Sequence, residues 1–283
     1  MPNVLGIPYP QTAPVDVRDG LRAHLHTNFP DIDPQLLERD IEAWQDLRRK
    51  CVSRAAPVGP SPLLRDYAAQ LDCAVRMLKN KAGTAFPWTP GFSNAPPMQC
   101  YESIDAERAY VLLWIAAEHA QSASCESRST SESLKRAANE FQMAAGCLAH
   151  MATLPLPAPL QDQVPCLRHL MLAQAQECFW QKAVQDGLRD TTIAKLAQGV
   201  STLYADSVAL APPSALPTDW LQHMECKRWH FAAAAMYRKS CDDLAQRRHA
   251  DELGRLMLAA SYVERARRAG TRAVATAVVD DVQ

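Results

Sequence analysis

The sequence lacks every feature that would send the chain through or into a membrane. No run of about eighteen apolar residues, the length that can cross a bilayer, occurs in its 283 residues. The opening MPNVLGIPYP has neither the basic n-region nor the apolar h-region of a secretory signal. Lys and Arg number 30 against 31 Asp and Glu, and this balance argues against a general nucleic-acid binder. We therefore expect a cytoplasmic protein.

Motifs for catalysis and for metal binding are also absent. The sequence contains no G-x-G-x-x-G, no phosphate-binding loop, no H-E-x-x-H and no G-x-S-x-G. Adjacent acids such as Asp242 and Asp243 point to different sides of a helix and cannot work as an acid/base couple. Several histidines fall in helical runs without a partner at metal-ligand spacing: His150, His169, His223 and His230. The sequence therefore predicts no catalytic residue, no metal and no cofactor.

The cysteines form no recognisable framework. Nine of them are spread between positions 51 and 241, with no C-x-x-C pair and no His/Cys cluster at zinc spacing. Cys147, Cys178 and Cys226 fall inside apolar helical runs. We interpret the nine as reduced, buried, small hydrophobic residues of a cytosolic protein.

What the sequence does contain is a long helical stretch at 167–208. It has no proline and is rich in Ala, Leu, Gln, Lys and Glu, which lose little freedom in a helix. Gly187, followed closely by Asp190, predicts that one helix ends there and another begins. The short link between them predicts an antiparallel pair.

Other segments extend this mainly α architecture. Four prolines and two β-friendly pieces, Val4–Ile7 and Val15–Val17, predict an irregular ribbon at 1–17 that pairs with a strand at 82–92. The spacer 154–165, with four prolines, cannot be helical throughout. Thr218 or Ser214 is the expected cap of the helix at 218–244. Apolar periodicity predicts further helices at 16–26, 34–52, 63–78, 101–123 and 134–151.

The segment from Cys226 onward has a different pattern. Small residues and aromatics alternate along two helices joined by a tight turn near Arg248, as in the helix–turn–helix units of tetratricopeptide-type solenoids. Only one such unit is clear. We therefore predict one domain over 1–283, with a small sheet and the first helices in 1–100 and a stack of long helices in 101–283. Such stacks expose extended surfaces that suit binding to extended partners.

Four segments, in this order, resemble a known family: NVLGIPYPQTAPVDV, LKRAANEFQMAAGCLAHM, LMLAQAQECFWQKAVQDGLRDTTIAKLA and WLQHMECKRWHFAAAAMYRKSCDDL. The chain is similar to the Bro-one domain of the Alix/PalA family from residue 3 to about 280. Its PalA-type members, scaffolds of the fungal ambient-pH pathway, are the most similar. The resemblance implies a banana-shaped helical domain with a tetratricopeptide-like core and a small N-terminal sheet.

The same resemblance implies a non-enzymatic adaptor. Its concave face would bind the C-terminal amphipathic helix of an ESCRT-III subunit, in ambient-pH signalling or endosomal sorting, and so be recruited to endosomal or plasma membranes. Thr192, Leu196 and Gly199 lie at three- and four-residue steps and can share one helix face. Ile193, next to Thr192, could be the core residue instead. Ordinary core packing is the alternative interpretation for every residue of the apolar patch named below. The family's apolar patch falls on Leu134, Phe179, Thr192 and Leu196, with Lys182 beside it and Ser131 at a position that is acidic in Alix.

Two further expectations rest on the family comparison. A full Bro-one domain is longer, so we expect this chain to be a C-terminally truncated form with weakened ESCRT-III binding. The V-shaped domain that reads the pathway's transcription factor is absent, which makes that partner doubtful. Two alternatives remain: a helical stub without groove activity, and a membrane-surface binder. The latter would use residues 227–272, which hold eleven Lys/Arg against five Asp/Glu, although a solvated helical face is the simpler interpretation.

Overall fold

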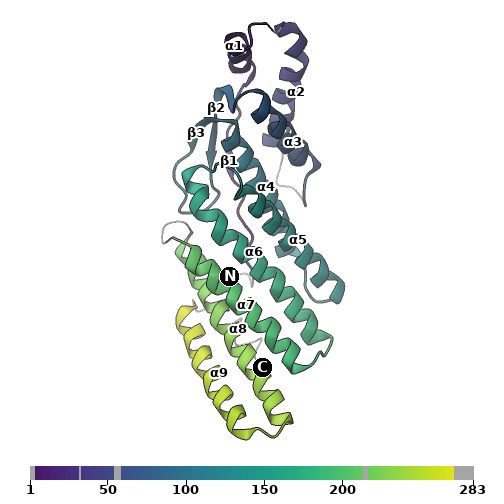
Figure 1. Ribbon diagram of the computed structural model, residues 1–283, viewed down its shortest axis with the longest axis vertical. Helices are drawn as coiled ribbons and strands as arrows, with labels where there is room; N and C mark the ends of the chain where they lie inside the picture. The colour runs from purple at the N-terminus through teal and green to yellow at the C-terminus, as the bar shows by residue number, and fades with distance from the viewer. Residues whose placement is uncertain (1–3, 32, 54–58, 213–215, 271–283) are drawn as a thin grey trace.

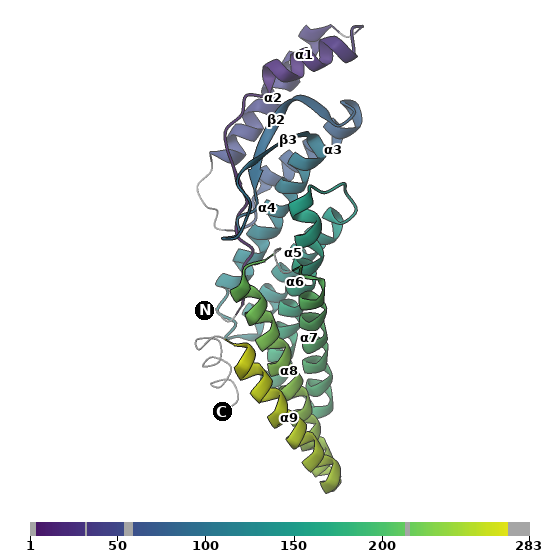
Figure 2. The ribbon, with the colours of Figure 1, turned by 90° about the vertical axis from the view of Figure 1, so that its left-hand side faces the viewer.

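The computed structural model describes residues 4–31, 33–53, 59–212 and 216–270. In this part of the chain the fold is mainly helical and elongated (Figures 1 and 2). Three helices and a small sheet form one end, and six longer helices stack side by side toward the other end (Figure 1). The helices are α1 (Arg18–Asn28), α2 (Pro34–Val52), α3 (Pro62–Met77), α4 (Ile104–Cys125), α5 (Ser131–Met151), α6 (Ala158–Gln185), α7 (Asp190–Leu210), α8 (Thr218–Ala245) and α9 (His249–Ala269).

The sheet has three antiparallel strands in the order β1 (Gln11–Thr12), β2 (Lys81–Thr89) and β3 (Gln99–Ser103). The predicted pairing between the N-terminal ribbon and a strand near 82–92 is confirmed. Two details of the prediction are wrong. The paired ribbon residues are 11 and 12 rather than the β-friendly pieces, and β3 occupies residues where a helix from 101 was expected.

The first described residues belong to the core of the helical stack instead. The carboxamide of Gln174 on α6 accepts from the Leu5 N–H at 2.5 Å and donates to the Leu5 carbonyl at 2.9 Å. Gln121 on α4 donates to the Ile7 carbonyl at 2.9 Å. Side-chain amides thus satisfy an extended backbone that has no strand partner, and Ile7 is fully buried.

Local signals place most helix ends as predicted. Asp33 precedes α2 and accepts from the Gln35 N–H at 3.0 Å. Gly187 has φ +64° and ends α6 in a Schellman motif, in which the Leu188 N–H donates to the Ala183 carbonyl at 3.0 Å. The predicted break between two helices at this glycine is therefore confirmed.

The start of α6 and the cap of α8 differ from the prediction, whereas α8 begins at Thr218 as predicted. α6 begins at Ala158, so eight residues of the predicted spacer are helical and Pro165 lies inside the helix. Packing against α5 and α7 outweighs the backbone hydrogen bond that Pro165 cannot make. α8 has Pro217, not Thr218, at its N-cap and no side-chain cap bond there. Ser214 lies outside the described residues.

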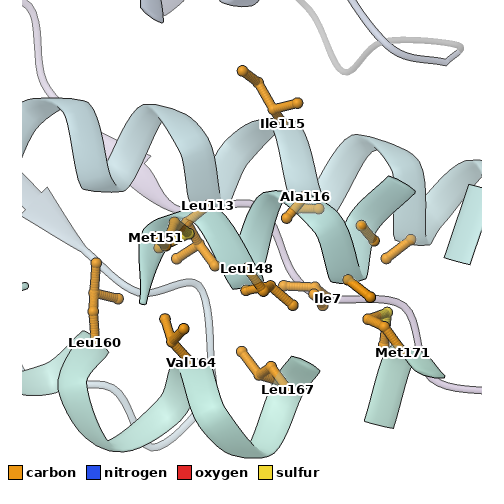
Figure 3. Packing of buried hydrophobic residues seen from close by; sticks show 14 of the residues in the cluster. Ile7, Leu113, Ile115, Ala116, Leu148, Met151, Leu160, Val164, Leu167 and Met171 are labelled. Atoms are coloured by element: carbon orange, nitrogen blue, oxygen red, sulfur yellow. The ribbon is translucent and has the colours of Figure 1, made fainter. Parts of the chain in front are cut away.

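The core runs along the stack, where α4, α5 and α6 meet the N-terminal ribbon (Figure 3). Ile7 lies among Leu113 and Ala116 of α4, Leu148 of α5 and Met171 of α6 (Figure 3). Many interface positions are alanine, which lets long helices approach each other closely. Burial of this apolar surface is the main stabilising contribution to the stack.

Burial does not extend to every cysteine. Cys178 and Cys226 are buried as predicted, but Cys147 is only half-buried. Cys73, Cys100 and Cys125 are exposed, so the interpretation of all nine as buried is wrong. Within the described residues, no helix is both long enough and apolar enough to cross a membrane.

Candidate partner-binding face

The antiparallel order of α5, α6 and α7 brings the start of α5, the end of α6 and the start of α7 to the same end of the stack. The ends of α6 and α5 that meet here each carry a charge pair. Lys182 binds Asp186 one turn later, and Lys135 binds Glu132 at 2.7 Å. The hydrogen bond from Lys135 lowers the pKa of Glu132, and the charge of Lys182 contributes in the same direction. The end of α6 is therefore within electrostatic reach of α5.

Most of the predicted patch is accessible on this surface. Phe179 is 38% exposed, an unusual position for a phenylalanine beside a dense core. Thr192 is exposed, and Lys182 and Leu196 are half-buried. We call the surface formed by Ser131, Phe179, Lys182, Thr192, Leu196 and Gly199 the α5–α7 face.

Leu134 does not belong to that accessible surface. It is only 1% exposed and packs in the core under the first turn of α5. A direct contact between Leu134 and a partner therefore gains no support from the structure. Ile193 is also buried at 2%, which leaves its neighbour Thr192 as the outward-facing residue of the two.

Gly199 lies where α7 packs on α6. A Cβ atom at this position would lie 3.6 Å from the amide nitrogen of Gln176, an ordinary van der Waals contact. The space beside Gly199 is therefore open enough for a small side chain. The half-buried Leu196 and Gly199 lie one turn and two turns along α7 from Thr192.

A buried polar cluster holds α6, α7 and α8 in place under this face. The Tyr204 hydroxyl on α7 donates to Glu177 on α6, and Lys227 on α8 donates to the same carboxylate at 3.2 Å. Burial raises the pKa of Tyr204 well above its ordinary value, and the charge of Glu177 adds to the effect. The hydroxyl therefore keeps its proton and remains a donor.

One exposed apolar residue near the face was not predicted. Leu188 is 46% exposed and lies in the turn between α6 and α7. Its signal in the sequence was a leucine directly after the glycine that ends a helix, a position where a Schellman motif often has an apolar residue. It extends the apolar surface toward the tip of the helix pair.

The basic region of α8 and α9 is largely neutralised by internal pairs. Asp243 is 1% exposed and accepts from Arg248 and Arg255. Arg238 pairs with Asp190 on α7 at 2.9 Å. These pairs favour the interpretation as a structural and solvated surface. In the described residues no group of His, Cys, Asp and Glu is arranged to hold a metal ion.

The geometry so far defines a class of fold: a stack of antiparallel helix pairs joined to a small N-terminal sheet. Residues 4–283 match the family model of the BRO1-like domain. The chain therefore belongs to the BRO1-like domain family. The match indicates a scaffold domain and no catalytic family.

Curated relatives and solved structures agree with this assignment. The chain is 38% identical over 276 residues to the pH-response regulator protein palA/RIM20 of Emericella nidulans, covering 93% of this chain and 32% of the relative. It is 33% identical to palA/prr-1 of Neurospora crassa, covering 99% of this chain and 34% of the relative. The chain thus spans about a third of the length of these relatives. The ALIX BRO1–CHMP4C complex superposes with a TM-score of 0.79 at 25% identity, over 93% of this chain and 79% of that chain.

Proposed function

We propose that the chain is a non-enzymatic adaptor that binds the C-terminal amphipathic helix of an ESCRT-III subunit through the α5–α7 face. The observation that carries the proposal is the likeness to the ALIX BRO1 domain in its complex with CHMP4C. The half-buried Leu196 and the partly exposed Phe179 supply apolar contacts for one side of such a helix. Lys182 and Ser131 supply polar contacts at the rim.

The biological setting belongs to the same proposal. The palA-type relatives are pH-response regulators, and this supports a role in fungal ambient-pH signalling. Endosomal sorting is the related role, because a plant relative from Arabidopsis thaliana is the vacuolar-sorting protein BRO1. In either role the ESCRT-III partner would bring a cytoplasmic chain to an endosomal or plasma membrane.

The test is a titration of the full chain with a fluorescently labelled ESCRT-III C-terminal helix, read by anisotropy. Leu196→Asp places a charge that must lose its water on binding, and we expect affinity to fall about 100-fold. Leu210→Asp is the matched control, because Leu210 lies on the same helix, is 43% exposed and is remote from the face. Its affinity should equal that of the unmodified chain.

Two outcomes would contradict the proposal. Absence of binding by a folded, unmodified chain would leave a helical stub as the better description. Equal loss in both variants would indicate binding at another surface. Salt-sensitive flotation with phosphatidylserine liposomes, without any peptide, would favour the membrane-surface alternative.

A further inference from the structure

An apolar groove, the α1–α3 groove, lies between helices α1, α2 and α3. These helices are at the end of the molecule opposite α9 (Figure 1). The groove has a volume of about 240 Å³. Its floor consists of buried side chains from all three helices, and Met77 at its edge is 68% exposed. The half-buried Leu25 and Leu37 stand on either side.

Two hydrogen-bond acceptors that line this groove have no donor partner in the part of the chain that the structure describes. Asp40 is the one charged residue that lines it, and its carboxylate has no hydrogen bond or ion pair within the described residues. The Gln70 side-chain oxygen is buried and has no donor there either. Other acids on the same helix are paired: Glu38 with Arg22, and Glu42 with Arg18 at 3.4 Å. Asp40 therefore stands out as an available anionic contact.

The groove floor is held rigid by a buried cluster. The Trp44 indole N–H donates to the Tyr67 hydroxyl at 3.3 Å, and Tyr67 donates to the buried Glu107 at 2.8 Å. The polar edge of Trp44 is thus satisfied inside the protein while its ring lines the groove. A floor fixed in this way loses little freedom when a ligand binds, which favours binding.

We propose that this groove is a docking site for a basic amphipathic segment of a partner protein. Pockets for small organic ligands usually measure about 300–1,000 Å³, so this smaller groove suits one or two inserted side chains. An apolar anchor enters between Leu25 and Leu37, and a neighbouring Lys or Arg binds Asp40. An acidic segment is excluded by repulsion from the unpaired carboxylate. The site is independent of the α5–α7 face.

The test uses a displayed library of random 16-residue peptides selected on the full chain. We expect enriched peptides to carry apolar residues at three- and four-residue steps next to Lys or Arg. Leu37→Glu and Asp40→Lys should each weaken them at least about tenfold. Leu37→Glu places a carboxylate that must lose its water where the apolar anchor inserts, and Asp40→Lys repels the Lys or Arg of the peptide. Leu253→Glu, which changes an exposed leucine on α9 that lies in neither proposed surface, is the control and should leave affinity unchanged.

A second readout comes from Cys73, an exposed thiol that lines the groove. In a chain with Cys100 and Cys125 replaced by serine, bound peptide should slow maleimide labelling of Cys73 several-fold. Met77→Lys provides a variant at an exposed position, where folding is not at risk, and should also weaken the peptides.

Three results would overturn the proposal: selected peptides that bind Leu37→Glu as well as the unmodified chain, peptides rich in acidic residues, or peptides that leave Cys73 labelling unchanged. A chain that dimerises by light scattering, and loses the dimer in Leu37→Glu, would assign the groove to a second copy and also overturn it.

Discussion

Two buried glutamates, Glu107 and Glu177, organise the two ends of this molecule in different ways. Glu107 in the sheet-bearing half is fully buried and accepts from Arg48 at 3.0 Å, from Tyr67 and from Trp88. Glu177 in the stack is 1% exposed and accepts from Tyr204 and Lys227. Each carboxylate lies under one proposed binding surface: Glu107 behind the α1–α3 groove and Glu177 behind the α5–α7 face.

The two clusters differ in the cation that binds the carboxylate and in the other groups to which this cation donates hydrogen bonds. Arg48 also donates to the Ala13 carbonyl and to the Thr12 hydroxyl, so it ties the N-terminal ribbon to α2 and α4. Lys227 joins helices that already pack along their length. A fork-shaped guanidinium suits the first task, because several acceptors surround it, while a single ammonium suffices for the second. Irregular backbone therefore depends more on its polar cluster than the helical stack does.

The largest expected effect comes from removing these carboxylates. Glu107→Gln leaves a buried guanidinium without its counterion and should lower the free energy of unfolding by about 3–5 kcal/mol. Glu177→Gln should lower it by about 2–4 kcal/mol at pH 7.

Urea unfolding at pH 7 measures the loss of unfolding free energy in both variants. Glu132→Gln, an exposed carboxylate on α5, is the control and should change stability by less than about 0.5 kcal/mol. Equal losses of unfolding free energy in the two buried variants would show that the identity of the cation does not matter.

A smaller effect is the loss of stability of the helical stack at acidic pH. His223 and His230 on α8 flank Lys227, and burial, together with the charge of Lys227, lowers the pKa of each to about 3. The unfolded chain takes up protons at these sites near pH 6.5, whereas the folded chain does not. Stability from the two histidines is therefore complete above about pH 6.5 and is lost as pH falls toward 3.

Unfolding at pH 7 and pH 5 tests this effect. We expect the unmodified chain to lose about 2 kcal/mol per buried histidine over this interval. His223→Gln and His230→Gln should each remove one such loss, while His26→Gln, an exposed residue on α1, should not. Carboxyl groups with a lowered pKa, such as Glu38, change the free energy of unfolding only at more acidic pH. The difference between pH 7 and pH 5 therefore reports mainly the histidines. An unchanged acid sensitivity in the double variant would refute the assignment.

The sequence predicted those features that depend on neighbouring residues. The bounds of α2, the end of α6 at Gly187 and the turn near Arg248 follow from caps and periodicity, and all three are present. Leu36 in the first turn of α2 is 74% exposed, so a leucine near a helix start does not by itself mark the buried face. The burial of Val4–Ile7 could not be predicted, because the clamp on Leu5 comes from Gln174, 169 positions away.

The same distinction applies to the α5–α7 face. Its residues came from the family resemblance, and the shared exposure of Phe179 and Thr192 on neighbouring helices agrees with that choice. Leu134 shows what the resemblance could not predict. It lies in the first turn of α5, and only the packing of α5 on α6 decides whether such a position belongs to the core or to the surface. The α1–α3 groove was not predicted at all, since it requires three helices to leave space between them.

The smallest expected effect comes from removing helix caps, because each cap supports only one of the two proposed binding surfaces. The Thr130 hydroxyl accepts from the Ser133 N–H at 3.1 Å at the start of α5, and Asp33 caps α2. Thr130→Ala and Asp33→Ala should each lower the free energy of unfolding by about 1 kcal/mol. Thr130→Ala should weaken the ESCRT-III peptide slightly and leave the groove peptides unaffected, and Asp33→Ala should do the reverse. If either variant weakened both ligands equally, the two surfaces would be coupled through the packing between them, and the two carboxylate clusters could no longer be treated as separate supports.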